Sequence, residues 1–145
     1  MKQLLYLKDE QLKQLIEKIF VSYRETFSDS KKILEKHSIG IAHHKVIHLI
    51  SQYEGITMSE LLKKLKVTKQ SLNRVIKDLI KLQIITFKKD QIDTRIKHVY
   101  LNEKGLKLFD EIFSTQKKRF YKALLNSNSK EVLYFNNVLK KIINE

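Results

Sequence analysis

The sequence predicts a mainly α-helical fold with one small β-hairpin, formed by a single domain of 145 residues. Apolar residues recur at three- and four-residue steps through most of the chain, which is the spacing of amphipathic helices. Two short β-type runs interrupt this spacing, both within residues 84–101. Three glycines and no proline leave few positions for sharp turns, and the hydrophobic fraction of 42% is sufficient for one core.

The N-terminal part predicts two helices. Residues 9–36 predict one long amphipathic helix, and residues 41–53 predict a second that ends before Gly55. The apolar positions of the long helix are Leu12, Leu15, Ile16, Ile19, Phe20, Tyr23 and Phe27.

Two shorter helices follow, each opened by a residue that can cap it. Thr57-x-x-Glu60 has the spacing of a capping box and predicts a short third helix. Thr68 can cap a fourth helix that runs to about Leu82. The side of the fourth helix that we expect to be buried carries Leu72, Val75, Ile76 and Leu79.

The period then changes from helical to β-type. Residues 84–87 and 96–101 predict two strands, because the first is rich in β-formers and the second alternates apolar and polar residues. Residues 88–95 between them are polar and turn-like. This segment therefore predicts a hairpin with a basic tip.

Two helices are expected after the hairpin. Asn102 can cap one that runs to about Leu125, and Asn128-x-x-Glu131 can cap the last. The first and last helices of the chain have wide apolar faces that little else in a small chain can cover. We therefore expect a homodimer built from both ends of the chain.

The charge favours a polyanionic partner, either nucleic acid or an anionic membrane. Lys and Arg number 29 against 16 Asp and Glu, which gives a formal net charge of +13. The excess is concentrated in residues 57–100, which carry eleven basic and four acidic residues.

Several classes of function are excluded or not supported. The absence of cysteine excludes disulfides, thiolate metal sites, cysteine nucleophiles and thiol redox sensing. No Gly-rich phosphate loop, HExxH motif or nucleophile elbow is present, so we expect neither an enzyme nor a cofactor. No apolar run is long enough to span a bilayer, and we expect a soluble, cytoplasmic protein.

The element order of three helices and a hairpin is that of a winged helix. The outward side of the fourth helix carries only hydrogen-bonding and cationic side chains, and Asp78 is the only carboxylate between Thr68 and Phe87. Such groups match the donors and acceptors of base edges in a major groove, although a solvated helix face would also be polar. The predicted base-reading residues are Lys69, Gln70, Ser71, Asn73, Arg74 and Lys77.

The hairpin predicts a second DNA contact. Lys88, Lys89 and Arg95 would project from the wing, where an Arg suits a narrow minor groove. Asp93 could orient Arg95 or Arg74 through a charge-assisted hydrogen bond. For the hairpin alone, a solvated charged turn is the alternative interpretation.

These residues resemble the MarR family of winged-helix transcription regulators over about residues 39–105. The wing and its exit match through Asp93-x-Arg95, Leu101 and Gly105. The two helices of the DNA-binding motif begin with family-like segments, Thr57-x-Ser59-Glu60-Leu61 and Thr68-Lys69-Gln70-Ser71-Leu72-Asn73-Arg74. Three positions differ: Asn102 stands for a usual Thr, Phe87 for a basic residue, and Gln83 for a Gly, so Gln83 must be left-handed or the turn must differ.

The resemblance implies one MarR-like domain, 1–145, in which residues 9–36 and 102–145 form dimerisation helices and 39–101 form the DNA-binding part. It implies a homodimer on double-stranded DNA, with a palindromic operator and repression as the expected mode. The predicted phosphate contacts are Thr57, Lys63, Lys64 and Lys66.

Histidine and effector sites are weaker predictions. His44 and His48 have a spacing that can bind a metal, but packing or solvent-facing roles are favoured. Members of the family often bind small aromatic acids, so a small-molecule effector could bind between the dimer helices and the DNA-binding part. Residues that could line such a cleft are Tyr23, Arg24, His44 and Tyr53, although core and interface roles are favoured.

Two alternatives to a sequence-specific regulator stay open. One is a winged helix used as an architectural or protein-interaction module. The other is a basic amphipathic protein that docks on membranes, which is disfavoured because the long helices need their apolar faces for the core.

Overall fold

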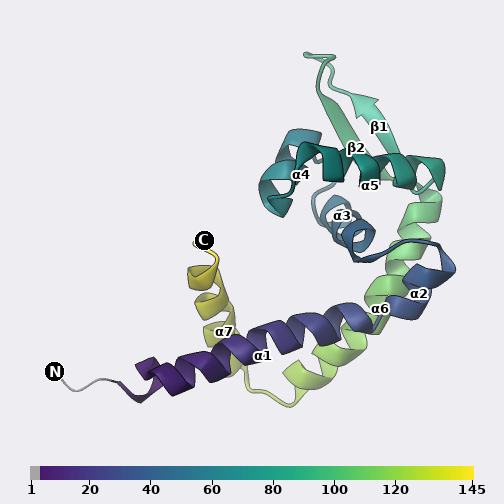
Figure 1. The fold of residues 1–145 in the computed structure, drawn as a ribbon. Helices are drawn as coiled ribbons and strands as arrows, with labels where there is room; N and C mark the ends of the chain where they lie inside the picture. Colours follow the sequence, from purple (N-terminus) through teal and green to yellow (C-terminus); the bar gives the residue numbers. More distant parts are fainter. Residues whose placement is uncertain (1–3) are drawn as a thin grey trace.

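The computed structural model describes residues 4–145, and it confirms a mainly helical fold with a two-stranded antiparallel wing. The winged part lies at the top of Figure 1, and the long helices α1 and α6 extend away from it. No helix in residues 4–145 has the length and hydropathy needed to cross a bilayer. The elements are η1 (Leu5–Leu7), α1 (Asp9–Ser28), α2 (Lys31–Lys36), α3 (Ile41–Gln52), α4 (Met58–Leu65), α5 (Lys69–Lys81), β1 (Ile85–Lys89), β2 (Lys97–Leu101), α6 (Glu103–Leu125) and α7 (Ser129–Ile142).

Four helices begin at the capping residues that the sequence predicts. The side-chain oxygens of Thr57, Thr68, Asn102 and Asn128 each accept a hydrogen bond from the backbone amide three residues further on. Each bond satisfies an amide that the helix itself leaves unpaired. These four local signals therefore set the starts of α4, α5, α6 and α7.

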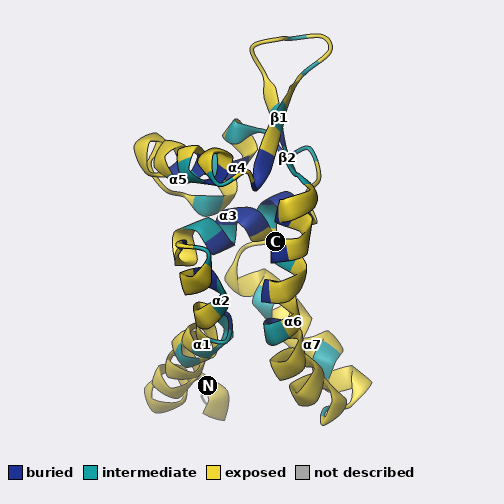
Figure 2. Ribbon diagram, turned by 90° about the vertical axis from the view of Figure 1, so that its right-hand side faces the viewer, coloured by how far each residue is buried: buried dark blue, intermediate teal, exposed yellow. Residues whose placement is uncertain are grey.

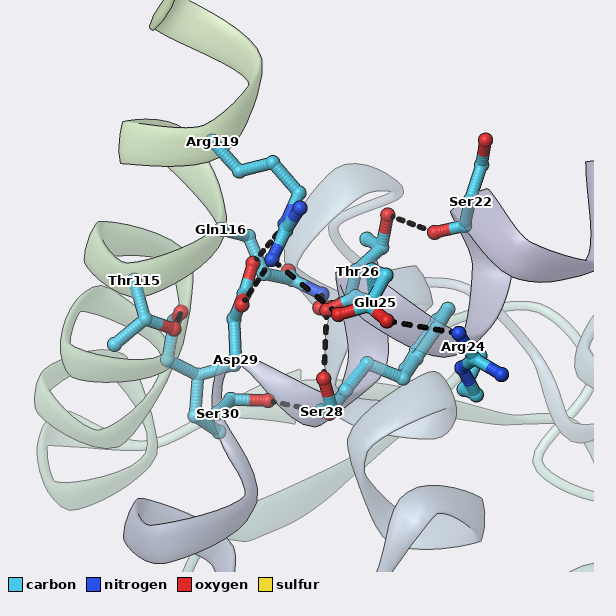
Figure 3. A network of polar contacts seen from close by, with 12 residues as sticks. Ser22, Arg24, Glu25, Thr26, Ser28, Asp29, Ser30, Thr115, Gln116 and Arg119 are labelled. Atoms are coloured by element: carbon cyan, nitrogen blue, oxygen red, sulfur yellow. Dashed lines mark hydrogen bonds and ion pairs between the residues drawn. The ribbon is translucent and has the colours of Figure 1, made fainter. Parts of the chain in front are cut away.

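The prediction of one helix over residues 9–36 is wrong, because the helix is interrupted at Asp29 and Ser30, which separate α1 from α2. Arg119 of α6 donates from Nε and Nη2 to the two carboxylate oxygens of Asp29, at 2.6 and 2.9 Å (Figure 3). Gln116 donates from Nε2 to the carbonyl oxygen of Thr26 at 3.1 Å. The break is therefore stabilised by contacts with a helix about 90 residues away, which helical periodicity cannot reveal.

Gln83, in the turn from α5 into the wing, has a φ of 61°, so of the two expected outcomes the left-handed conformation is the one present. The side-chain amide of Asn102 donates to the carbonyl oxygen of Gln83. A Cβ on Gly105 would lie 2.2 Å from the carbonyl oxygen of Ile84, so only glycine lets α6 approach this turn. The match of Gly105 to the MarR pattern thus has a steric reason.

The core lies where α3 meets α5, the wing and α6 (Figure 2). In contrast, α1 and α7 contain no buried residue. The buried apolar residues are Leu34, Ile39, Val46, Ile47, Ile50, Ile56, Leu61, Leu72, Ile76, Leu79, Ile84, Ile85, Val99, Leu108 and Ile112.

The strands of the wing pair from Ile85 opposite Leu101 to Lys89 opposite Lys97. Lys88 and Lys89 therefore lie within β1 and not in the tip, which corrects the expected extent of the turn. The reason is that pairing continues past the β-rich run, since exposed positions of a hairpin accept lysine.

Candidate nucleic-acid interface

The helices α4 and α5 form the helix-turn-helix. Lys66 ends α4 in the left-handed conformation, with φ of 52°, and Thr68 then caps α5. Thr68 accepts from the amide of Ser71 at 3.1 Å and its hydroxyl donates to the Ser71 hydroxyl at 2.8 Å. This arrangement places the first turn of α5 at the surface.

The outward side of α5 is exposed, and none of its fully exposed residues is acidic, since Asp78 is only half exposed. All six predicted base-reading residues are exposed, whereas Leu72, Ile76 and Leu79 on the opposite side are buried. The exposed set is Lys69, Gln70, Ser71, Asn73, Arg74 and Lys77. A surface with this composition offers donors to base edges and phosphates and offers no repelling carboxylate.

The one carboxylate of α5 is bound to another helix. Asp78 Oδ2 lies 2.9 Å from Nε2 of His43 in α3. Nδ1 of the same ring accepts from the amide of Gly40 at 3.1 Å, so Nε2 is the nitrogen that donates to Asp78. The ring therefore ties the acid to α3 and joins the two helices.

The wing adjoins α5 through the short turn that connects them. The amide of Ile84 donates to the carbonyl oxygen of Leu79 at 2.9 Å, and α5 contacts β1. The hairpin extends beyond α5 in both ribbon views (Figures 1 and 2). The wing is thus attached directly to the C-terminal end of α5.

Arg95 at the wing tip is held by Asp93. Its Nε and Nη2 donate to the two oxygens of Asp93, each at 3.0 Å, while the Arg95 side chain stays 89% exposed. The Arg95 side chain, through its hydrogen bonds, and the Arg95 amide lower the pKa of Asp93. The sequence predicted either Arg95 or Arg74 as the partner of Asp93, and in the structure the partner is Arg95.

Aromatic rings hold two of the predicted phosphate-contacting or wing lysines. Lys64 Nζ lies 4.1 Å from the centre of the Tyr53 ring, and Lys88 Nζ lies 4.7 Å from that of Tyr100. Thr57 caps α4 and is partly buried, whereas Lys63, Lys64, Lys66 and Lys89 are exposed.

His98 and Asp90 form a contact that sequence reasoning missed. The His98 ring lies between the carbonyl oxygen of Gly55, at 2.7 Å, and Asp90 Oδ1, at 2.9 Å. The three residues come from the α3–α4 turn, the wing turn and β2. Only the tertiary structure brings them together, because the contact needs both the fold of the hairpin and the position of the turn at Gly55.

A cavity of about 660 Å³ lies between the winged part and the long helices. It is mainly apolar, with Phe27, Phe113 and Phe120 in its wall, and His48, Lys45, Lys64 and Lys117 supply polar groups. Tyr23 and Arg24 line a separate cavity of about 490 Å³ beside α1 and α2. None of the four residues that the sequence offered as a possible cleft lining reaches the cavity of about 660 Å³. Those residues are Tyr23, Arg24, His44 and Tyr53.

The structure places these four residues differently from one another. His44 is fully buried, with Nδ1 3.4 Å from Ser30 Oγ, and burial followed by the nearby His48 lowers its pKa to about 4. Tyr23 and Tyr53 are 45% and 44% exposed, so neither belongs to the core of a single chain, and the interface role favoured for them stays a prediction. In residues 4–145 no group of three or more His, Asp or Glu side chains is arranged to hold a metal ion.

Comparison with known proteins finds similarity in sequence and in backbone. A model of the MarR family matches residues 37–96. The HTH-type transcriptional regulator PetP of Rhodobacter capsulatus is 39% identical over 140 residues, which cover 97% of this chain and 84% of that protein.

Two solved structures share the fold. MarR of Staphylococcus aureus in complex with salicylate and kanamycin has a TM-score of 0.71 and 23% identity, over 92% of this chain and 91% of that one. A mutant MarR from E. coli complexed with operator DNA has a TM-score of 0.67 and 22% identity, over 97% of this chain and 99% of that one.

Proposed function

Because this chain belongs to the MarR family of winged helix-turn-helix transcriptional regulators, we propose that it represses transcription as a homodimer bound to a palindromic operator. The family is one of DNA-binding transcriptional regulators and not of enzymes. The observation that carries the proposal is the exposed, acid-free side of α5 next to a wing that presents Arg95.

In the proposed complex, α5 enters a major groove and the wing contacts the adjacent minor groove. Gln70, Asn73 and Arg74 read base edges, together with Lys69, Ser71 and Lys77 around them. Arg95 enters the minor groove with Asp93 as its orienting partner. The phosphate contacts are Thr57, Lys63, Lys64, Lys66, Lys88 and Lys89.

The proposed dimer is supported by the exposed apolar residues of the terminal helices. Phe20 in α1 is 57% exposed, and Phe135 in α7 is 52% exposed. A second copy of the chain would cover these residues and relate two α5 helices by a two-fold axis. Two half-sites related by the same axis make the operator palindromic.

The test is binding of the protein to the DNA upstream of its own coding region. Fluorescence anisotropy at two salt concentrations should give tighter binding to this DNA than to a scrambled duplex, with affinity falling steeply in salt. Equal affinity for both duplexes would contradict sequence-specific regulation and favour the architectural module.

We also propose that the cavity binds an aromatic carboxylate as effector. Phenyl rings line it, and the ammonium groups of Lys45, Lys64 and Lys117 can pair with a carboxylate. The similar S. aureus MarR is in complex with salicylate, which makes salicylate the first probe. Salicylate should weaken operator binding, and benzyl alcohol, which lacks the carboxylate, should not. Equal effects of both compounds would contradict the proposed chemistry.

A further inference from the structure

One side chain joins the wing to the helix-turn-helix. His98 Nδ1 lies 2.7 Å from the carbonyl oxygen of Gly55, and Nε2 lies 2.9 Å from Asp90 Oδ1. Gly55 belongs to the turn before α4, and Asp90 is the first residue after β1. The imidazole therefore connects the start of the DNA-binding motif to the turn of the wing.

On the wing side, Asp90 organises the turn that carries Arg95. Asp90 Oδ2 accepts from the amides of Ile92 and Asp93, at 3.1 and 3.0 Å. Asp93 in turn binds the Arg95 guanidinium through both carboxylate oxygens. Ile92, at the tip, is 96% exposed, so packing of this side chain does not hold the turn. The polar contacts of Asp90 and Asp93 do so instead.

On the other side, the same part of β2 is bonded to the chain entering α4. The amide of Val99 donates to the carbonyl oxygen of Ile56 at 2.8 Å, and Thr57 forms a β-bridge with His98. Gly55 has φ of 81°, and a Cβ there would lie 3.0 Å from the Tyr100 hydroxyl. The carbonyl oxygen that His98 meets is thus held by a constrained turn.

We propose that His98 and Asp90 are positioning residues that fix the wing turn relative to the helix-turn-helix, and so set where Arg95 meets the operator. The inference rests on the proposed function, since it assigns these residues a part in operator binding. Neither side chain needs to contact DNA. They act through the orientation of Arg95.

The charge state of His98 decides whether both of its bonds can form. A carbonyl and a carboxylate both accept, so each ring nitrogen must carry a proton, as in the imidazolium ion. The hydrogen bond with Asp90, then that with Gly55, raises the pKa of His98. The backbone amide of Asp93, followed by His98, lowers the pKa of Asp90 to about 2.

Charged groups of the neighbouring elements act on the same ring. Glu60 of α4 raises the pKa of His98 electrostatically, whereas Lys88 of β1 lies opposite His98 in the strand register. Because the pKa of His98 is raised, both bonds are present below its value and one is lost as the pH rises through it. Operator affinity should therefore fall over this interval in the wild type.

The experiment measures operator affinity of the full-length protein by fluorescence anisotropy at pH 6 and pH 8. At pH 6, H98Q and D90N should each weaken binding roughly 3- to 10-fold, because each removes the charge-assisted hydrogen bond between His98 and Asp90. D110N is the matched control, since Asp110 is exposed on α6 and its change removes the same charge. It should bind as the wild type does.

Two further comparisons separate positioning from a general loss of stability. The double variant R95A/H98Q should bind no more weakly than R95A, because His98 acts through Arg95. The decline in affinity from pH 6 to pH 8 should be smaller in H98Q than in the wild type. Additive losses, or identical pH profiles, would overturn the inference.

The free protein supplies a readout without DNA. In D90N, NMR titration should give a lower pKa for His98, and the amides of Ile92 and Asp93 should exchange faster. An unchanged pKa of His98 together with unchanged exchange of these amides would overturn the inference. If the wild type distinguishes operator from scrambled DNA but H98Q binds the operator as tightly as the wild type does, the inference fails and the proposed function stands. If wild type does not distinguish them, the proposed function itself fails.

Discussion

The winged part of the molecule and its terminal helices carry opposite distributions of apolar surface. In the winged part, α3, α5 and the hairpin bury residues such as Ile47, Leu79 and Val99 almost completely. Helices α1 and α7 bury none of their residues (Figure 2). Their apolar side chains, such as Phe20 and Phe135, are as hydrophobic as those buried in the winged part. One chain therefore completes the core of the DNA-binding part, whereas its terminal helices have the composition of an interface.

The largest expected effect tests the completed core. Leu79→Ala should lower the free energy of unfolding by ~2–5 kcal/mol, because it leaves a cavity at a residue that is 0% exposed. Urea unfolding followed by circular dichroism measures this change. Ile80→Ala is the control on the same helix, where the side chain is 45% exposed. Equal losses for the two variants would contradict the packing described here.

The next effect tests the terminal helices. Phe135→Glu should weaken association of two chains by ~2–4 kcal/mol, since a charge would replace an aromatic residue at the proposed interface. Sedimentation should detect monomers, while the helical signal per chain stays close to that of the wild type.

The control for this variant is Asn137→Glu, which adds the same charge about 200° around α7 from Phe135. It should leave the dimer intact. A stable dimer in Phe135→Glu would remove α7 from the interface and leave its apolar residues without an explanation.

The sequence could predict features that depend on residues close together in the chain. The starts of α5 and α6 follow from Thr68 and Asn102, because a capping bond joins residues only three positions apart. The left-handed Gln83 was one of two outcomes that the resemblance to the MarR family implied, because the family has a glycine at this position. These features are local, and the fold class that depends on them is confirmed.

Features that depend on distant contacts were not predictable. The break at Asp29 needs Arg119, which lies far along the chain in α6. The hydrogen bonds of His98 with Gly55 and Asp90 need the register of the hairpin and the turn at Gly55. For the candidate site, the sequence predicted an exposed α5 side and a basic wing, whereas the bond between Asp78 and His43 depended on tertiary packing. The assignment of individual residues to bases or phosphates stays a prediction.

Arg74→Ala tests the exposed side of the winged part. Arg74 is exposed, so its removal should change DNA reading without lowering the free energy of unfolding appreciably. Discrimination between operator and scrambled DNA should fall by ~1–3 kcal/mol, because a base-edge contact is lost. Competition anisotropy with both duplexes measures this difference. Unchanged discrimination would show that other residues of α5 read the sequence.

The smallest expected effect separates phosphate binding from base reading within the winged part. Lys89→Ala removes an exposed cation from β1 and should weaken operator and scrambled DNA alike. The slope of log affinity against log salt concentration should fall in magnitude by ~1, since one phosphate contact is lost. Lys13→Ala is the control in α1, where the lysine is also exposed but belongs to the terminal helices. An unchanged slope in Lys89→Ala, or an equal decrease in Lys13→Ala, would mean that net charge and not the position of the wing governs affinity.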